Sequence, residues 1–366
     1  MKIKYFKSIF LFLLTTSLVF ANNTGPVLKG RYTKEKKIKK EYNVNTNALL
    51  KINNSYGNVD ITSWSENRIV IEVTIKTNGN NEEKVAEKLN DIDVDFEASA
   101  GFVSAITRIG KDRNNSWWNS WNNSSNVNME INYLIKMPIT NSVDLNNDYG
   151  GIFLNKLEGQ AKISCDYGKL ELGELMADNN YLNFDYTNNS TIGYMKSGKI
   201  NADYSAFTLE KAENVELNAD YTKSSFNSVK NLNYDCDYGS VTAEQIGKIT
   251  GRGDYLSVKF GSVSGDVNIN ADYGSIKIDE LTAKAGDVVI QSDYAGIKLG
   301  YSADYNFRFS IKLEYAGLGG EEDFEINKQR IESSDKFYEG YYGSASAKNS
   351  ININSEYGGV TFNKIN

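Results

Sequence analysis

The stretch that decides the fold is VNINADYGSIKIDEL, residues 267–281. Alternate positions before Asp272-Tyr273 are apolar or small, and alternate positions after Gly274 are apolar again. Alternation with a period of two is the pattern of a half-buried strand. The stretch therefore predicts two short strands joined at Tyr-Gly.

The same pattern recurs along most of the chain. Asp-Tyr pairs follow one another at steps of 18, 19, 18, 17, 17, 17, 18 and 21 residues, from Asp148-Tyr149 to Asp293-Tyr294. Glu314-Tyr315 follows 21 residues later, and Glu356-Tyr357 a further 42 residues later, which we interpret as two steps with one motif lost. The repeat-structural tyrosines are Tyr56, Tyr149, Tyr167, Tyr186, Tyr204, Tyr221, Tyr238, Tyr255, Tyr273, Tyr294, Tyr315 and Tyr357.

Most motif tyrosines are followed by apolar residues at plus three, plus five and plus eight, as Ile152, Leu154 and Leu157 follow Tyr149. A coil of two such strands cannot bury its apolar edge alone, so successive coils must stack. The pattern predicts an all-β fold, a single-stranded β-solenoid of 17–21-residue Asp-Tyr-Gly coils. The usual preference of parallel connections makes it a right-handed β-helix. A small insertion of one helix and several strands is expected near the N-terminus.

Alternation also predicts which side chains face the core. The small residue before each motif aspartate should point inward, as at Cys165, Ala202 and Cys236, and the aspartate outward. The residue three before the tyrosine should point outward as well, where stacked amides can bond to one another. A flat polar strip that recognises sugar is the alternative. This asparagine column comprises Asn53, Asn146, Asn183, Asn201, Asn218, Asn270 and Asn354.

The aspartate column has two interpretations. Ca²⁺ prefers clustered oxygen ligands, but the GGxGxD rhythm of calcium-loading β-rolls is missing. We favour aspartate as a turn-capping acceptor and expect neither a metal nor a cofactor. Cys165 and Cys236 lie four coils apart, roughly 19 Å at about 4.8 Å per coil, whereas a disulfide needs Cα atoms within about 7 Å. We expect two free, buried thiols.

The first residues are typical of an export signal. Lys2, Lys4 and Lys7 precede an apolar run from Ile9 to Phe20, and Ala21 stands at the cleavage position. We expect a protein of the periplasm, the outer surface or the medium. No later stretch approaches the roughly twenty apolar residues of a transmembrane helix. Without the three signal lysines, the net charge of −7 becomes −10, which excludes the basic footprint of a nucleic-acid partner.

The repeats are interrupted at both ends of the chain. Val85 and Leu89 show helical spacing within an insertion that should cap the first coil, because exposed solenoid ends need caps. The expected organisation is a signal peptide (1–21), a lead-in (22–48), a first coil and strand (49–77), a capping insertion (78–137) with a Trp-rich loop (114–126), the repeats (138–318), a second insertion (319–350) and a final coil (351–366).

The loop at 114–126 contains Trp117, Trp118 and Trp121 among asparagine and serine. These indoles are the candidate ligand-binding residues, because tryptophan offers a broad ring face and an N–H donor to a sugar or a partner surface. The alternative is that they fold back over the apolar end of the solenoid.

The chain resembles the bacterial putative adhesins, a β-solenoid family of unknown function related to the head domain of putative autotransporter adhesins. The resemblance rests on the signal peptide, a first coil that ends at Trp64, the helical insertion, Met137-Pro138 and the Asp-Tyr-Gly repeats, and covers residues 40–366. It implies a surface or periplasmic location and an adhesive role. It brings no catalytic residues.

We expect an exported, non-catalytic binding protein that contacts a glycan or a cell-surface protein. The alternative is a periplasmic structural or envelope-regulatory protein. A polysaccharide-active β-helix enzyme is the weaker rival, because acids recur in every coil instead of clustering, and no histidine is present as a general base. Arg252-Gly253-Asp254 matches an adhesion tripeptide, but it lies inside a predicted strand.

Overall fold

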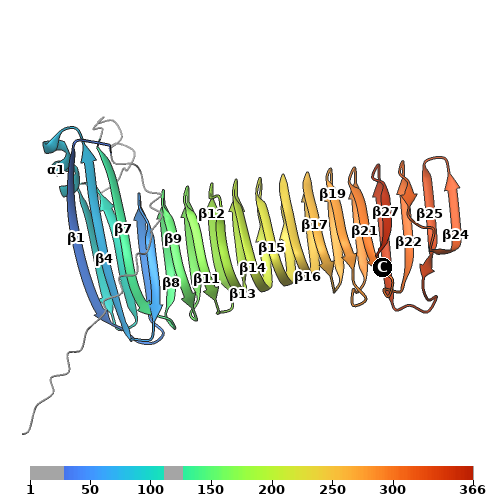
Figure 1. The fold of residues 1–366 in the computed structure, drawn as a ribbon, viewed down its shortest axis with the longest axis horizontal. Coiled ribbons are helices and arrows are strands. Elements are labelled where there is room, and N and C mark those ends of the chain that lie inside the picture. Colours follow the sequence, from blue (N-terminus) through green and yellow to red (C-terminus); the bar gives the residue numbers. More distant parts are fainter. Residues whose placement is uncertain (1–28, 111–126, 366) are drawn as a thin grey trace, which may run out of the picture.

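The computed structural model describes residues 29–110 and 127–365. The described chain is all-β, as the sequence predicts, with 71% of the described residues in strands and 3% in helix. The 27 strands of these described ranges form one sheet that is not closed. The molecule is elongated, with the N-terminal strands at one end and β24 (Glu325–Glu332) and β25 (Asp335–Tyr342) at the other (Figure 1).

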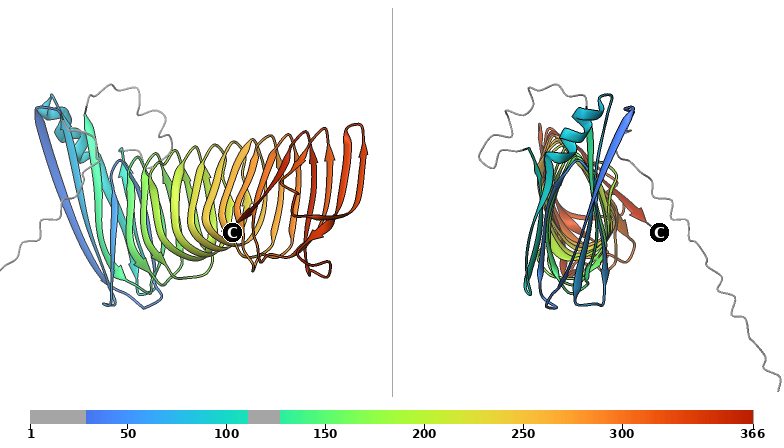
Figure 2. Two further views of the ribbon diagram at one scale, coloured as in Figure 1. Left: turned by 45° about the vertical axis from the view of Figure 1, so that its right-hand side comes forward. Right: turned by 90° about the vertical axis from the view of Figure 1, so that its left-hand side faces the viewer.

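Each repeat contributes two strand segments, which lie on opposite sides of a flattened coil (Figure 2). Segments that precede the motif tyrosine pair in parallel with each other, as Asp148 with Asp166, and segments that follow it do the same, as Leu154 with Leu172. Equivalent positions therefore form straight rows along the stack. The strands are β8 (Ser142–Asp148), β9 (Gly151–Leu157), β10 (Ala161–Asp166), β11 (Lys169–Leu175), β12 (Asn180–Asp185), β13 (Ser190–Asp203), β14 (Ala206–Asn218), β15 (Lys223–Asp235), β16 (Gly239–Asp254), β17 (Leu256–Val263), β18 (Val267–Asp272), β19 (Ser275–Leu281), β20 (Val288–Asp293) and β21 (Gly296–Ser302).

Rows of apolar side chains fill the space between the two sides. Ile152, Leu154 and Leu157 are at most 3% exposed, and the small residues before the motif aspartates are buried too, as at Cys165 and Ala202. Both predictions are confirmed. Full burial of one such aliphatic side chain contributes about 1.5–3 kcal/mol, so the interior rows are the main source of stability.

The bend at each motif comes from the tyrosine itself. All twelve motif tyrosines have a φ between +49° and +63°, the left-handed region. There the backbone turns without losing its ladder, because the N–H of Tyr149 donates to the carbonyl of Asp166 in the next coil at 2.9 Å. The glycine that follows the motif tyrosine lies close to the backbone of the adjacent coil. A Cβ on Gly150 would stand 1.9 Å from the carbonyl oxygen of Gly57.

The N-terminal end is closed by antiparallel strands and the helix. β4 pairs with β1 on one side and β7 on the other, β5 pairs with β6, and α1 packs on β1 and β4. The first coil, β2 and β3, lies between β6 and β7 on one side and β8 and β9 on the other. The elements are β1 (Tyr32–Asn43), β2 (Leu49–Ser55), β3 (Val59–Trp64), β4 (Arg68–Gly79), α1 (Glu82–Asn90), β5 (Ile92–Ser99), β6 (Phe102–Ile109) and β7 (Asn128–Pro138).

The prediction of a lead-in at 22–48 omits a strand, because this range contains β1. The inward-facing positions of β1 include Lys34 and Lys36, which pair with Glu82 and Asp93. Lysines that face a neighbouring element do not produce the apolar alternation by which a strand is recognised. The strand is held by its pairing with β4 along its whole length.

The final coil of the sequence does not lie at the end of the stack. β26 (Asn349–Glu356) pairs with both β20 and β22 (Phe307–Glu314), and β27 (Val360–Ile365) pairs with β21 and β23 (Leu318–Gly319). The last coil is thus inserted between two earlier ones, and Figure 1 shows β27 between β21 and β22. The reason is that β25 occupies the outer edge of β22 and β24 continues beyond it, which leaves only the inner edge of β22 for β26.

Candidate functional site

The motif tyrosines form a continuous ladder of stacked rings on the surface, which we call the tyrosine ladder. Neighbouring ring centroids are 4.6–5.2 Å apart with interplanar angles of 1–9°. The order in space follows the sequence except at the end, where Tyr357 lies between Tyr294 and Tyr315. Apart from the more buried Tyr56, the rings are about half exposed, and Tyr315 is the most exposed at 59%.

Stacking limits what the tyrosine ladder can bind. Each interior ring has a neighbour on both faces, so only ring edges and hydroxyls reach solvent. A sugar ring needs an uncovered aromatic face to pack against, and only the end rings, Tyr56 and Tyr315, have a single stacked neighbour within the ladder. Of these two, Tyr315 is the more exposed. Along its length the ladder is therefore a structural row with a polar rim.

The motif aspartates run beside the ladder and connect successive coils. Oδ1 of Asp203 accepts a hydrogen bond from the N–H of Asp220 at 3.0 Å, and five more coils repeat this contact. Aspartate is thus a backbone acceptor, but its partner is on the next coil and not in its own turn. Burial, followed by repulsion from neighbouring carboxylates, raises the pKa of Asp148 and Asp254. Among residues 29–110 and 127–365, no cluster of three or more acidic or cysteine side chains is arranged to hold a metal ion.

The predicted hydrogen bonding along the asparagine column is wrong. In the part of the chain that the structure describes, no amide of this column bonds to the next one; Asn201 instead donates to the hydroxyl of Tyr181 at 2.8 Å. The column is interrupted by Asp235 and Arg252, which pair with each other, so a continuous amide row does not form. Amide pairs do occur elsewhere, between Asn231 and Asn214 and between Asn54 and Asn147.

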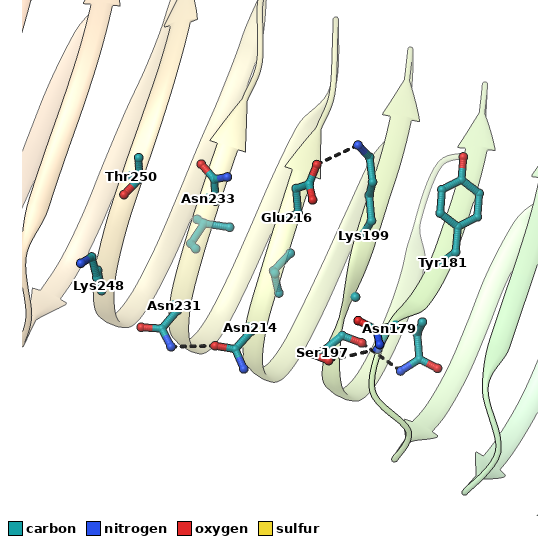
Figure 3. A pocket seen from close by; sticks show the side chains of 14 residues that line it. Asn179, Tyr181, Ser197, Lys199, Asn214, Glu216, Asn231, Asn233, Lys248 and Thr250 are labelled. Carbon is teal, nitrogen blue, oxygen red and sulfur yellow. Dashed lines mark hydrogen bonds and ion pairs between the residues drawn. The ribbon is translucent and has the colours of Figure 1, made fainter.

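A polar groove of about 690 Å³ crosses the outer side of five successive coils, from β12 to β16. It is formed by residues five and seven positions before the motif tyrosines, which point outward together (Figure 3). The side chains labelled in Figure 3 are Asn179, Tyr181, Ser197, Lys199, Asn214, Glu216, Asn231, Asn233, Lys248 and Thr250.

Several groove side chains are fixed by their neighbours. Lys199 pairs with Glu216 at 2.7 Å, and Nδ2 of Asn231 donates to Oδ1 of Asn214 at 2.7 Å. Within the described ranges, the side chains of Asn233 and Thr250 have no protein hydrogen-bond partner, and they face the groove (Figure 3). The groove thus offers free donors and acceptors on a rigid sheet.

A second hollow of about 310 Å³ adjoins the groove nearer the tyrosines. It contains the pair of Arg252 and Asp235, and the hydrogen bond from Arg252 lowers the pKa of Asp235. Arg252 lies in β16, so the Arg-Gly-Asp sequence is part of a strand and not of an exposed loop.

The candidate residues Trp117, Trp118 and Trp121 lie outside the described residues. The fourth tryptophan, Trp64, is half-buried, and its indole N–H donates to the carbonyl of Arg68 at 2.8 Å, while the Arg68 guanidinium lies 5.0 Å from the ring centroid. Both cysteines are free and buried, as the sequence predicts. Sequence reasoning missed the groove, although polar residues recur there in five successive coils.

Comparison with solved structures finds distant likenesses. A putative adhesin from Parabacteroides merdae is 10% identical over 90% of this chain and 96% of its own, with a TM-score of 0.33. A putative adhesin from Parabacteroides distasonis is 11% identical over 75% of this chain and 94% of its own (TM-score 0.31). A putative cell adhesion protein from Clostridium sporogenes is 13% identical over 91% of this chain and 100% of its own (TM-score 0.17).

These descriptions agree with the resemblance that the sequence carries. No family model and no curated protein matches the chain. Within the described residues, no helix is both long and apolar enough to cross a bilayer.

Proposed function

We propose that the chain is an exported, non-catalytic binding protein, a right-handed β-solenoid that contacts a glycan or a protein at a cell surface. The observation that carries the proposal is the register of the coils. Equivalent residues stand opposite one another from coil to coil, as Ser190 opposite Phe207 and Asn201 opposite Asn218 in β13 and β14, with a register shift between β19 and β21. The outer surface therefore presents straight rows in which a position recurs about every 4.8 Å. Extended, regular surfaces of this kind suit polymers and large partners.

The two interruptions of the repeat fit the role of caps. The insertion at 78–137 contributes α1 and β5–β7 at the N-terminal end, and the insertion at 319–350 contributes β24 and β25 at the C-terminal end, whereas the final coil lies within the stack. β24 forms the outermost edge at the C-terminal end, and all its side chains are exposed. Four of the eight residues in its sequence EINKQRIE are charged, a composition that opposes strand addition by other chains. A capped stack remains a separate particle that can present its sides for binding.

The distribution of acids supports a binding role over catalysis. The motif carboxylates occur singly in each coil, and six of them accept a neighbouring backbone N–H, which is a structural task. A polysaccharide hydrolase needs instead two carboxyl groups with different pKa values on either side of one bond.

The proposal is tested with the chain from residue 22 onward, incubated with insoluble polysaccharides and with isolated bacterial envelopes, and recovered by sedimentation. We expect it to sediment with at least one of them. A variant with Trp117, Trp118 and Trp121 changed to alanine tests the sequence-based expectation for the loop at 114–126. Loss of binding with an unchanged circular dichroism spectrum would assign the contact to these indoles.

The alternative, a periplasmic structural or envelope-regulatory protein, differs in location. An adhesin must be reachable from outside, so external protease or antibody added to intact cells should reach it. Protection in intact cells, together with no sedimentation on envelopes or polysaccharides, would contradict the proposed function.

A further inference from the structure

We infer that the polar groove across β12–β16 is a binding site for a linear, uncharged polysaccharide that lies along the axis of the stack. The inference rests on the proposed function and deepens it by naming the site and the ligand class. It is carried by the shape of the groove, its free hydrogen-bonding groups and its balanced charge.

The shape of the groove favours an extended chain. Its lining comes from five successive coils, and its rows run across the strands from Tyr181 to Thr250 (Figure 3). Five coils at about 4.8 Å each span on the order of 20 Å, several times the width of one sugar ring. The groove lies open on the surface of the sheet, so a long chain can enter from the side and continue past both ends.

The chemistry of the lining is that of hydroxyl recognition. Asn233 and Thr250 face the groove with unused donors and acceptors, and the bond between Asn231 and Asn214 leaves one amide group free on each. Tyr181 lies at one end of the groove and, unlike the tyrosines of the ladder, is not stacked on another aromatic ring of the described chain. Its ring can pack against the C–H face of a sugar, while the amides bond to hydroxyls.

The charges of the lining favour a neutral ligand. Both lysines in the groove are already paired, Lys199 with Glu216 and Lys248 with Asp266. A polyanion would therefore meet no uncompensated cation there, on a protein whose net charge is −7. The pairing of both lysines does not weaken the binding of a neutral glycan, because its hydroxyls can hydrogen-bond to amides and to ion-paired groups alike.

The test compares two double variants of the mature protein. Asn231→Ala/Asn233→Ala removes two of the amides that line the groove. Asn268→Ala/Asn270→Ala is the control, since these exposed, outward-facing asparagines lie on β18, five and three positions before Tyr273, and outside the groove. Binding is measured by calorimetry with neutral β-1,4-linked glucan, mannan and chitin oligosaccharides of increasing length, and with polygalacturonate as the charged probe.

We expect at least one neutral series to bind more tightly with length until it spans the five coils. Loss of two amide contacts should weaken the affinity of the groove variant for that glycan about tenfold, whereas the affinity of the control variant should not change. Unchanged affinity in the groove variant, with loss in the tryptophan variant, overturns the groove as the site and leaves the proposed function intact. Equal or tighter binding of polygalacturonate overturns the neutral ligand class. No binding by any of the four glycans overturns the inference, while sedimentation with envelopes still decides the proposed function.

Discussion

Removal of a ring from the middle of the tyrosine ladder should cost twice as much as removal from its end. Tyr221 stacks on Tyr204 and on Tyr238, each at 4.9 Å, whereas Tyr315 stacks only on Tyr357 within the ladder. An aromatic pair contributes about 0.5–1.5 kcal/mol beyond the area that it buries. Tyr221→Ala should therefore destabilise the stack by about 1–3 kcal/mol, and Tyr315→Ala by about half of that.

Two further substitutions at Tyr221 separate the ring from the backbone and the hydroxyl. Tyr221→Phe keeps both stacked pairs, and because the hydroxyl has no hydrogen-bond partner in the described chain, its stability should stay within a few tenths of a kcal/mol of the wild type. Tyr221→Gly loses the ring but relieves the left-handed backbone, whose φ is 53°. The glycine variant should therefore be up to about 1 kcal/mol more stable than the alanine variant.

The stability of these variants has to be measured locally, because the coils form a linear stack. Coils contact only their neighbours, so unfolding need not be a single cooperative step. Urea unfolding analysed with a nearest-neighbour model, together with amide hydrogen exchange of β14 and β15, gives the local free energy of opening. Equal losses for Tyr221→Ala and Tyr315→Ala, or a phenylalanine variant as unstable as the alanine variant, would refute stacking as the source of the energy.

Three other substitutions or probes test the corners and the core. Asp185→Asn should stabilise the protein at neutral pH, because burial and then neighbouring carboxylates raise the pKa of Asp185 in the folded state. A raised pKa favours the protonated folded state, so this gain in stability should vanish as the pH falls toward the unfolded pKa of about 3.9. A gain in stability that persists in acid would contradict this. Gly168→Ala should cost about 1–3 kcal/mol, because its Cβ would lie 2.0 Å from the carbonyl oxygen of Gly150, whereas Gly296→Ala has no atom within 4 Å; equal melting temperatures would speak against the clash. Burial raises the pKa of the Cys165 thiol to about 12, so iodoacetamide at about pH 8 should label it only after denaturation, and rapid native labelling would show the core to be open.

The core residues could be predicted from the sequence, because alternate residues of a strand point to opposite faces. Once Asp272-Tyr273 is taken as a corner, the alternation on both sides decides which residues face inward, and Ile269, Ile276 and Ile278 are at most 1% exposed. The same reasoning placed both cysteines correctly. It did not predict the tyrosine ladder, which depends on the left-handed backbone of each tyrosine and on the rotamers of exposed rings.

The order of the last coils could not be predicted for a related reason. Every coil offers the same motif and the same register, so Tyr357 would continue the ladder equally well after Tyr315 or before it. The choice is made by β24 and β25, whose antiparallel pairing occupies the outer edge of β22. Their sequence indicates an interruption but not the edge on which it will pair.

The groove was missed because it is a property of neighbouring coils and not of any one of them. Asn214 and Asn231 are ordinary outward-facing residues within their own strands, and they become a bonded pair only because the coils stack in register. The corners support that register, because Tyr221 and Tyr238 stack at 4.9 Å on the same two coils whose amides face the groove. A spacing that is fixed before the ligand arrives avoids the ordering cost that a flexible site would have to meet. A tyrosine-to-alanine change at the corner should therefore weaken binding in the groove even though the ring itself does not line it.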